Sequence, residues 1–161
     1  MGKAVLISIR PKWCDLIALG KKTIEVRRTR PKLKTPFKCY IYQTLPKSGD
    51  WNDKGGRVIG EFFCNSILEY RYPSCYSEHE ASGFFKRYAC ISAEEIWKYG
   101  QRKTLYGWHI SNLTIYDKPK ELSEFWSWQP SVEWKDGYPM PTHLIKRPPQ
   151  SFMYVEELAD G

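Results

Sequence analysis

The sequence predicts an α+β fold: a mixed, closed or nearly closed β-barrel of five to six strands with two or three peripheral helices. Three observations support this fold class. The 161 residues suffice for one domain but leave too little chain for a second independent core. Five runs have the alternating or β-branched composition of strands, and two have the signals of helices. Two helices are too few to cover both faces of a parallel sheet, which argues against a doubly wound fold.

The N-terminal part of the chain predicts a strand, a helix and a second strand. Residues 4–9 are a short β-branched run typical of a buried strand. Pro11 suits the first turn of a helix because it has no N–H to satisfy, and Gly20 is placed to end that helix in a left-handed conformation. Residues 23–27 then predict a strand of alternating polar and apolar residues. Its polar side would carry Thr23, Glu25 and Arg27.

Three further strands and a second helix follow. The predicted strands are residues 37–43, 57–70 and 104–116. Gly60, inside one of them, indicates a bulge or a close approach of two backbones. Ser92 and Glu95 have the spacing of a capping box, so a short helix should begin there and end at Gly100.

The C-terminal part is rich in proline and aromatic residues. From about residue 117, six prolines predict irregular segments that wrap the barrel, with an edge strand at residues 151–155. We therefore expect one domain, 1–161, with this wrap at its end. The wrap carries an aromatic cluster of Phe125, Trp126, Trp128, Trp134 and Tyr138. This cluster would stack unpaired bases, or else cap one end of the barrel or form a dimer contact. A further alternative is an adaptor that binds another protein through this cluster.

Cysteine and histidine spacing predicts no metal and no cofactor. The five cysteines are odd in number and include no C-x-x-C pair, and the three histidines lie far apart. The chain has no apolar run of the roughly 20 residues that a membrane span requires, and its start has no signal-peptide pattern. We expect a cytoplasmic protein with no membrane partner. The oligomeric state stays open.

Positive charge is concentrated in the first third of the sequence. Residues 1–47 carry twelve Lys and Arg against two Asp and Glu, whereas residues 48–161 carry thirteen against sixteen. Such an uneven distribution of positive charge is typical of a protein that binds a polyanion. Here it indicates nucleic acid as the polyanion. The alternative is a solvated face that only aids solubility.

Residues 20–27 read G-x-K-x-x-E-x-R and resemble the signature of the ASCH (activating signal cointegrator homology) domain family. The signature follows the first strand and helix, as it does in that family. Further similarity lies in LISIRPKW, KCYIYQTLPKSG, RVIGEFF, YGWHI and RPPQSFMYV, so the resemblance extends over most of residues 4–155. The resemblance implies a PUA-like barrel with a basic cleft between barrel and first helix that binds RNA, another single-stranded nucleic acid or a nucleotide.

The expected nucleic-acid-binding residues are Ser8, Arg10, Lys22, Glu25, Arg27, Arg28, Trp108, Gln150 and Ser151. Lys22 and Arg27 would clamp a phosphate, while Glu25 would orient them or meet a base edge or hydroxyl. The alternative for Glu25 is a structural ion pair with Arg27. Strict alternation would turn Lys22 away from Glu25, so Lys22 joins the site only if the turn at Gly20 extends through it.

The resemblance also implies an enzymatic alternative, in which Lys22, Glu25 and Thr23 would be the catalytic residues. Some ASCH relatives are amidohydrolases that act on N4-acetylcytidine, and others are ribonucleases. In the amidohydrolases a catalytic threonine stands where this chain has Glu25, and this difference argues against amidohydrolase activity. Thr23 lies on the same strand face but about 6.5 Å away along the strand.

Overall fold

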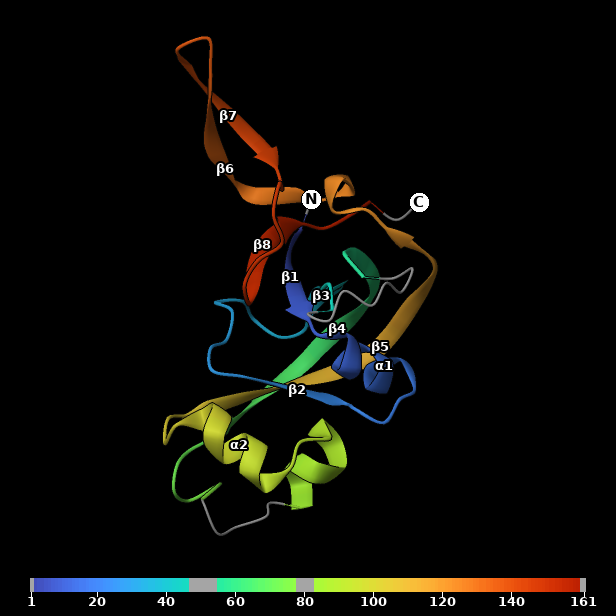
Figure 1. Ribbon diagram of the computed structural model, residues 1–161, viewed down its shortest axis with the longest axis vertical. Helices are drawn as coiled ribbons and strands as arrows, with labels where there is room; N and C mark the ends of the chain where they lie inside the picture. Colours follow the sequence, from blue (N-terminus) through green and yellow to red (C-terminus); the bar gives the residue numbers. More distant parts are fainter. Residues whose placement is uncertain (1, 47–54, 78–82, 160–161) are drawn as a thin grey trace. The chain divides into compact units, whose positions relative to one another are not determined.

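A computed structural model describes residues 2–46, 55–77 and 83–159 (Figure 1). Its elements, in chain order, are β1 (Lys3–Ile9), α1 (Pro11–Ala18), β2 (Ile24–Arg27), β3 (Phe37–Gln43), β4 (Arg57–Tyr70), the π-helix η1 (Phe85–Ala89), α2 (Ala93–Gly100), β5 (Leu105–Lys120), the 3-10 turn η2 (Leu122–Glu124), β6 (Trp126–Lys135), β7 (Tyr138–Leu144) and β8 (Phe152–Glu156). The predicted elements before residue 117 are therefore found close to their expected bounds. Part of the expected loop at residues 44–56 lies outside the described residues.

The strands form one mixed sheet in the order β2-β5-β4-β3-β1-β8-β6-β7. β1 pairs with β3 in parallel and with β8 antiparallel. The α+β class is confirmed, but the closed barrel of five to six strands is wrong, because the described residues form an open sheet of eight strands that ends at β2 and β7. The prediction failed because it counted no strand between residue 117 and residue 150.

The C-terminal segment is ordered rather than an irregular wrap. β6 and β7 form a hairpin whose two-residue turn is Asp136 (φ 51°) and Gly137 (φ 82°), the left-handed pair that Asp-Gly supplies most readily. The strand expected at residues 151–155 is found as β8. It is an internal strand, however, paired with β1 on one side and with β6 at Ser127 and Val155 on the other. The edge position therefore belongs to β7 instead.

The contacts divide the chain into two compact units, and each is described by itself. Unit 1 comprises Met1–Pro11, Lys38–Phe62 and Thr114–Gly161. Its core gathers buried residues of β1, β3, β4 and β8 around Phe125, whose ring lies 4.9 Å from that of Tyr40. Gly60 fits the predicted close approach, because a Cβ there would stand 2.4 Å from the carbonyl oxygen of Thr114.

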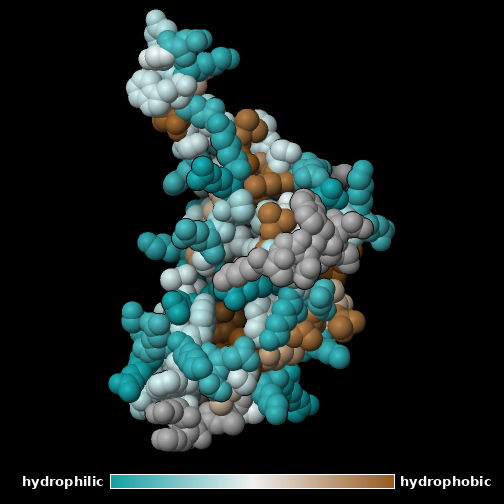
Figure 2. Space-filling model, viewed as in Figure 1, coloured by the Kyte–Doolittle hydropathy of each residue, from teal (hydrophilic) through white to brown (hydrophobic). Residues whose placement is uncertain are grey.

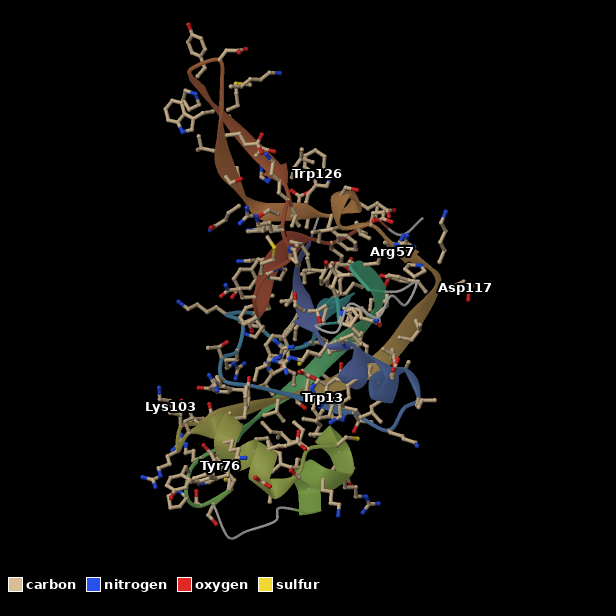
Figure 3. All side chains as sticks on the ribbon, in the orientation of Figure 1. Trp13, Arg57, Tyr76, Lys103, Asp117 and Trp126 are labelled. Carbon is tan, nitrogen blue, oxygen red and sulfur yellow. The ribbon has the colours of Figure 1, made fainter. Side chains whose placement is uncertain are left out.

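Unit 2 comprises Lys12–Phe37 and Phe63–Leu113. Its core packs β2 and the start of β5 against η1 and α2. α2 begins with the predicted capping box, in which the Ser92 hydroxyl accepts from the Glu95 backbone N–H at 3.1 Å. The Tyr76 hydroxyl donates to the Lys103 carbonyl, and both residues are labelled in Figure 3. Within the described ranges, no helix has the length and apolar character needed to cross a membrane.

Candidate functional site

The turn after α1 brings Lys22 to Glu25. Gly20 has a φ of 74°, and the backbone N–H groups of Lys21 and Lys22 both donate to the Leu16 carbonyl, at 3.0 and 3.1 Å. The turn therefore extends through Lys22, and β2 begins only at Ile24. This geometry removes Lys22 from the alternation of the strand. Its ammonium group accordingly reaches the face on which Glu25 lies.

Lys22, Glu25 and Arg27 form a buried cluster of charges in unit 2. Lys22 Nζ lies 3.5 Å from Glu25 Oε2 and donates to the Ala89 carbonyl at 2.7 Å. Arg27 Nε donates to Glu25 Oε1 at 3.0 Å. The side chains of Lys22, Glu25 and Arg27 are only 1, 7 and 12% exposed. The polar side of β2 is thus enclosed rather than solvated.

Burial makes the cluster electrostatically unusual. It lowers the pKa of Lys22, because desolvation penalises the ammonium form more than the nearby Glu25 carboxylate stabilises it. Glu25 Oε2 is buried and accepts no hydrogen bond from the part of the chain that the structure describes. At 3.5 Å its contact with Lys22 is an ion pair of poor hydrogen-bond geometry. One carboxylate oxygen of Glu25 is therefore buried without a hydrogen-bond donor from the described residues.

Aromatic rings lie beside two of the cations. Lys22 Nζ is 4.8 Å from the centre of the Trp13 ring, which α1 carries and which is partly exposed (Figure 3). Arg28 is exposed, stacks its guanidinium 4.6 Å from the centre of the Tyr99 ring and donates to the Tyr99 carbonyl at 2.9 Å. Burial raises the pKa of Tyr99 despite the nearby Arg27 and Arg28. Cations and π-faces are therefore interleaved in unit 2.

Two predicted site residues of unit 2 have structural roles. Trp108 is paired with Glu25 across β2 and β5, but it is fully buried and its indole N–H donates to the Thr29 carbonyl at 3.3 Å. Its ring has no exposed face for a base, so its position in this structure does not support the predicted contact with a nucleic acid. The backbone of Thr23 donates to Tyr88 and accepts from Ile110, which fixes the entrance to β2.

The other predicted residues belong to unit 1. Ser8 is buried, and its hydroxyl donates to the Pro149 carbonyl at 2.6 Å, while its backbone N–H donates to the Ser151 carbonyl at 2.9 Å. Ser8 thus ties the segment that contains Gln150 and Ser151 to β1. Arg10 and Gln150 are exposed. All four of these residues belong to unit 1, whereas the signature residues belong to unit 2.

Sequence reasoning missed the residues that enclose Lys22. η1 ends at Ala89, whose carbonyl holds the ammonium group, and Cys90 follows in a left-handed conformation with φ 57°. The Cys90 thiol donates to the Lys21 carbonyl at 3.5 Å, next in sequence to Lys22. A π-helix has no sequence pattern that distinguishes it from an α-helix, although such segments often lie at functional sites. Trp13 was likewise not among the predicted site residues, although its ring lies 4.8 Å from Lys22 Nζ.

The net charge of the protein lies entirely in unit 2. By sequence, unit 2 contains fourteen Lys and Arg against seven Asp and Glu, and unit 1 contains eleven against eleven. The formal charge of +7 is thus the charge of unit 2 alone.

In the described parts of the chain, no group of three or more His, Cys, Asp or Glu side chains could hold a metal ion.

Comparisons with known proteins identify the family. The chain matches the family model of the ASCH domain over residues 7–120. It is similar to the crystal structure of ASCH from Zymomonas mobilis, with a TM-score of 0.58 and 20% identity over 96% of this chain and 88% of that chain. The structure of a Tyr-to-Phe variant of the Z. mobilis protein gives a TM-score of 0.56 at 18% identity, over 96% of this chain and 91% of that chain. The structure of a Ser-to-Ala variant gives a TM-score of 0.54 at 19% identity, over 96% of this chain and 89% of that chain.

At these identities the solved structures establish the fold, and the family model establishes the membership. A search of curated proteins finds no match. The matched residues 7–120 make up more than half of the 161 residues and include the G-x-K-x-x-E-x-R signature. The chain therefore belongs to the ASCH domain family, whose fold is PUA-like.

Proposed function

We propose that this ASCH domain binds single-stranded RNA, or a nucleotide, through unit 2. The observation that carries the proposal is the placement of charge: unit 2 holds the whole +7, while unit 1 is neutral. Phosphate contacts supply most of the affinity of nucleic-acid-binding proteins, and they require basic residues gathered on one surface. Exposed cations of unit 2 at the end of β2 and in the loop after it, Arg28 and Arg30, would make such contacts.

Within this proposal, Lys22 positions the site and does not itself grip a phosphate. Its ammonium group is buried and already donates to the Ala89 carbonyl. Together Lys22 and Arg27 hold the Glu25 carboxylate in place through Coulomb attraction. We therefore assign the phosphate contacts expected of Lys22 to the exposed Arg28 and Arg30.

Glu25 would recognise a hydrogen-bond donor on the ligand. A buried carboxylate oxygen without a donor costs roughly 1–3 kcal/mol or more, and a ligand that supplies the donor recovers that cost. Exocyclic amino groups of bases and the ribose 2′-hydroxyl are donors of this kind. Because Glu25 Oε2 is buried, a nucleoside ligand would reach it only if side chains of the cluster move apart.

Stacking would add affinity without sequence preference. A base that stacks on an aromatic ring contributes about 1–3 kcal/mol. Trp13 is partly exposed, and the centre of its ring lies 4.8 Å from Lys22 Nζ. The Arg28 guanidinium over Tyr99 offers a second flat surface.

Fluorescence anisotropy with a short labelled single-stranded RNA tests the proposal. Arg28→Gln should weaken binding roughly threefold or more, because one exposed phosphate contact is lost. Lys118→Gln is the matched control, since Lys118 is also exposed but lies in neutral unit 1. Equal weakening by both variants would contradict a site in unit 2. Absence of binding by the wild-type protein at low salt would contradict RNA as the ligand.

A hydrolytic function is the second candidate, and the lowered pKa of Lys22 favours it. A lysine with a lowered pKa is neutral in a larger fraction of molecules, and a neutral amine can accept a proton from a nucleophile. Lys22 also lies near the Cys90 thiol and next in sequence to Thr23. A nucleic-acid-directed hydrolase would use Lys22 as the base, with Glu25 as the acid or base.

For N4-acetylcytidine we expect no release of cytidine at an enzymatic rate. Glu25 stands where the amidohydrolases of the family carry a threonine, and its negative charge would oppose the oxyanion that must develop beside it. A chromatographic assay for cytidine measures this directly. Turnover that disappears in Lys22→Met would place the hydrolase ahead of the binding protein.

A further inference from the structure

The short helix η1 of unit 2 has an inner and an outer side of different chemistry. Phe85 and Ala89 are each 1% exposed and pack in the core of unit 2 with residues of β2 and α2. α2 lies beside η1 in the same unit (Figure 1). The outer side consists of two exposed aromatic residues and two exposed cations: Phe84, Lys86, Arg87 and Tyr88. Buried residues therefore hold η1 in place while rings and positive charges face the solvent.

The two outer rings belong to a row of aromatic side chains. The centre of the Phe84 ring lies 5.7 Å from that of Tyr70, on β4, and 4.9 Å from that of Tyr88. Tyr70 is partly buried, and its ring centre lies 4.5 Å from that of Phe85. Phe84 and Tyr88 are 37 and 36% exposed. Because the inner rings support them, Phe84 and Tyr88 would lose little side-chain entropy when a ligand stacks on them.

Cations lie next to these rings. The Arg87 guanidinium is 5.3 Å from the centre of the Tyr88 ring. Residues 83–90 include Lys86 and Arg87 and no acidic residue. Proteins that bind single-stranded nucleic acid combine cations, which follow the phosphate backbone, with aromatic rings on which bases stack. The outer side of η1 has both kinds of group.

η1 is also joined directly to the signature segment. The backbone N–H of Thr23 donates to the Tyr88 carbonyl at 2.8 Å, and Lys22 Nζ donates to the Ala89 carbonyl at 2.7 Å. Both acceptors are backbone atoms, so a change of the Tyr88 side chain leaves these hydrogen bonds available. The outer side of η1 thus continues the part of unit 2 in which the signature residues lie.

The surface around η1 and α2 favours a charged partner over an apolar one. In Figure 2 this surface is mostly teal and pale, with little brown. Two exposed rings on one short helix offer much less apolar surface than the helices that bind at a membrane interface. By sequence, unit 2 has fourteen Lys and Arg against seven Asp and Glu. Charge complementarity together with the rings therefore indicates a polyanion that has flat apolar groups.

We propose that the outer side of η1 binds single-stranded RNA. The rings of Phe84 and Tyr88 stack on unpaired bases, and Lys86 and Arg87 contact the adjacent phosphates. This inference rests on the function proposed above and assigns a base-stacking surface to it. Since every base has a π-face, this surface should bind RNA with little preference for sequence.

Fluorescence anisotropy with a labelled single-stranded RNA tests the stacking. Tyr88→Leu removes the ring but keeps an apolar side chain, and it should weaken RNA binding about fivefold or more. Tyr88→Phe keeps the ring and should bind as the wild type does. Tyr138→Leu is the matched control, because it makes the same change at an exposed tyrosine of neutral unit 1 and should leave binding unchanged.

Competition by inorganic polyphosphate separates stacking from charge. Polyphosphate has the phosphates of RNA but no bases, so Tyr88→Leu should leave its affinity unchanged. Arg87→Gln should weaken the binding of both RNA and polyphosphate, because it removes a positive charge. Phe84→Leu is a second test of the stacking and should behave as Tyr88→Leu does. Circular dichroism of each variant confirms that the fold is retained.

Three results would overturn the inference. If the wild type binds RNA and both Tyr88→Leu and Phe84→Leu bind it equally well, η1 is not part of the site, although the proposed function stands. Equal weakening of RNA and polyphosphate binding by Tyr88→Leu would show that the ring does not stack on bases. Binding to vesicles of phosphatidylserine and phosphatidylcholine that Tyr88→Leu abolishes, with RNA binding unchanged, would assign η1 to a membrane surface. Absence of RNA binding by the wild type at low salt would instead contradict the proposed function itself, and this inference with it.

Discussion

Removing either partner from the buried Lys22–Glu25 pair should destabilise the protein strongly. Lys22→Met leaves Glu25 with Arg27 as its cation and leaves the Ala89 carbonyl without its donor. Breaking a buried ion pair by removing one partner costs about 3–5 kcal/mol, and the remaining Arg27 places the expected cost near the lower value, about 3 kcal/mol. In a chain of this length that corresponds to a fall in Tm of roughly 6–12 °C.

A double-mutant cycle measures the interaction energy between Lys22 and Glu25 apart from their interactions with other residues. Lys22→Met, Glu25→Gln and the double variant are compared by thermal unfolding, and the double variant should be more stable than the sum of the single losses predicts, by about 1–3 kcal/mol. The pair Glu94 and Lys98 is the control, because its charges are 2.7 Å apart but exposed. Its cycle should show no measurable coupling. A coupling between Lys22 and Glu25 as small as the control would refute the role of the buried cluster.

Two further predictions concern unit 2. Tyr70→Phe should raise the free energy of unfolding by about 1 kcal/mol, because the Tyr70 hydroxyl is buried without a hydrogen-bond partner. Burial also raises the pKa of Tyr70 from its ordinary value of 10.0 to about 12. The unfolded chain therefore ionises first, and the free energy of unfolding should fall as the pH rises from 10.0 to about 12. Denaturant unfolding over this pH range should show a smaller loss in Tyr70→Phe, and an equal loss would contradict this. Ser92→Ala should cost about 1 kcal/mol through loss of the α2 cap, and an unchanged Tm would show that the capping box contributes nothing.

Local chemistry explains why the first two-thirds of the fold could be predicted. Pro11 and Gly20 mark the ends of α1, and the capping box at Ser92 marks the start of α2, because each acts through contacts within a few residues. The alternation in residues 37–43 likewise appears as β3 with the predicted bounds. Such signals fix where elements lie, but they leave open how far a sheet continues.

The C-terminal strands and the burial of the site could not be predicted in the same way. The Asp136-Gly137 turn was an available hairpin signal, but the prolines around it suggested irregular structure, and only the register shows that two of them face the open edge. Lys22 looks like an ordinary surface lysine in sequence. Its burial depends on a carbonyl 67 residues away at Ala89, and no local pattern encodes that contact.

The central claim is that unit 2 binds a polyanion, and the salt dependence of RNA binding tests it most directly. With four to six phosphates contacted, the logarithm of the binding constant should fall with the logarithm of salt concentration at a slope of about −3 to −4. Anisotropy titrations of the wild-type protein at several salt concentrations measure that slope. A slope near zero, or no binding at low salt, would contradict the assignment of the +7 of unit 2 to a nucleic-acid site.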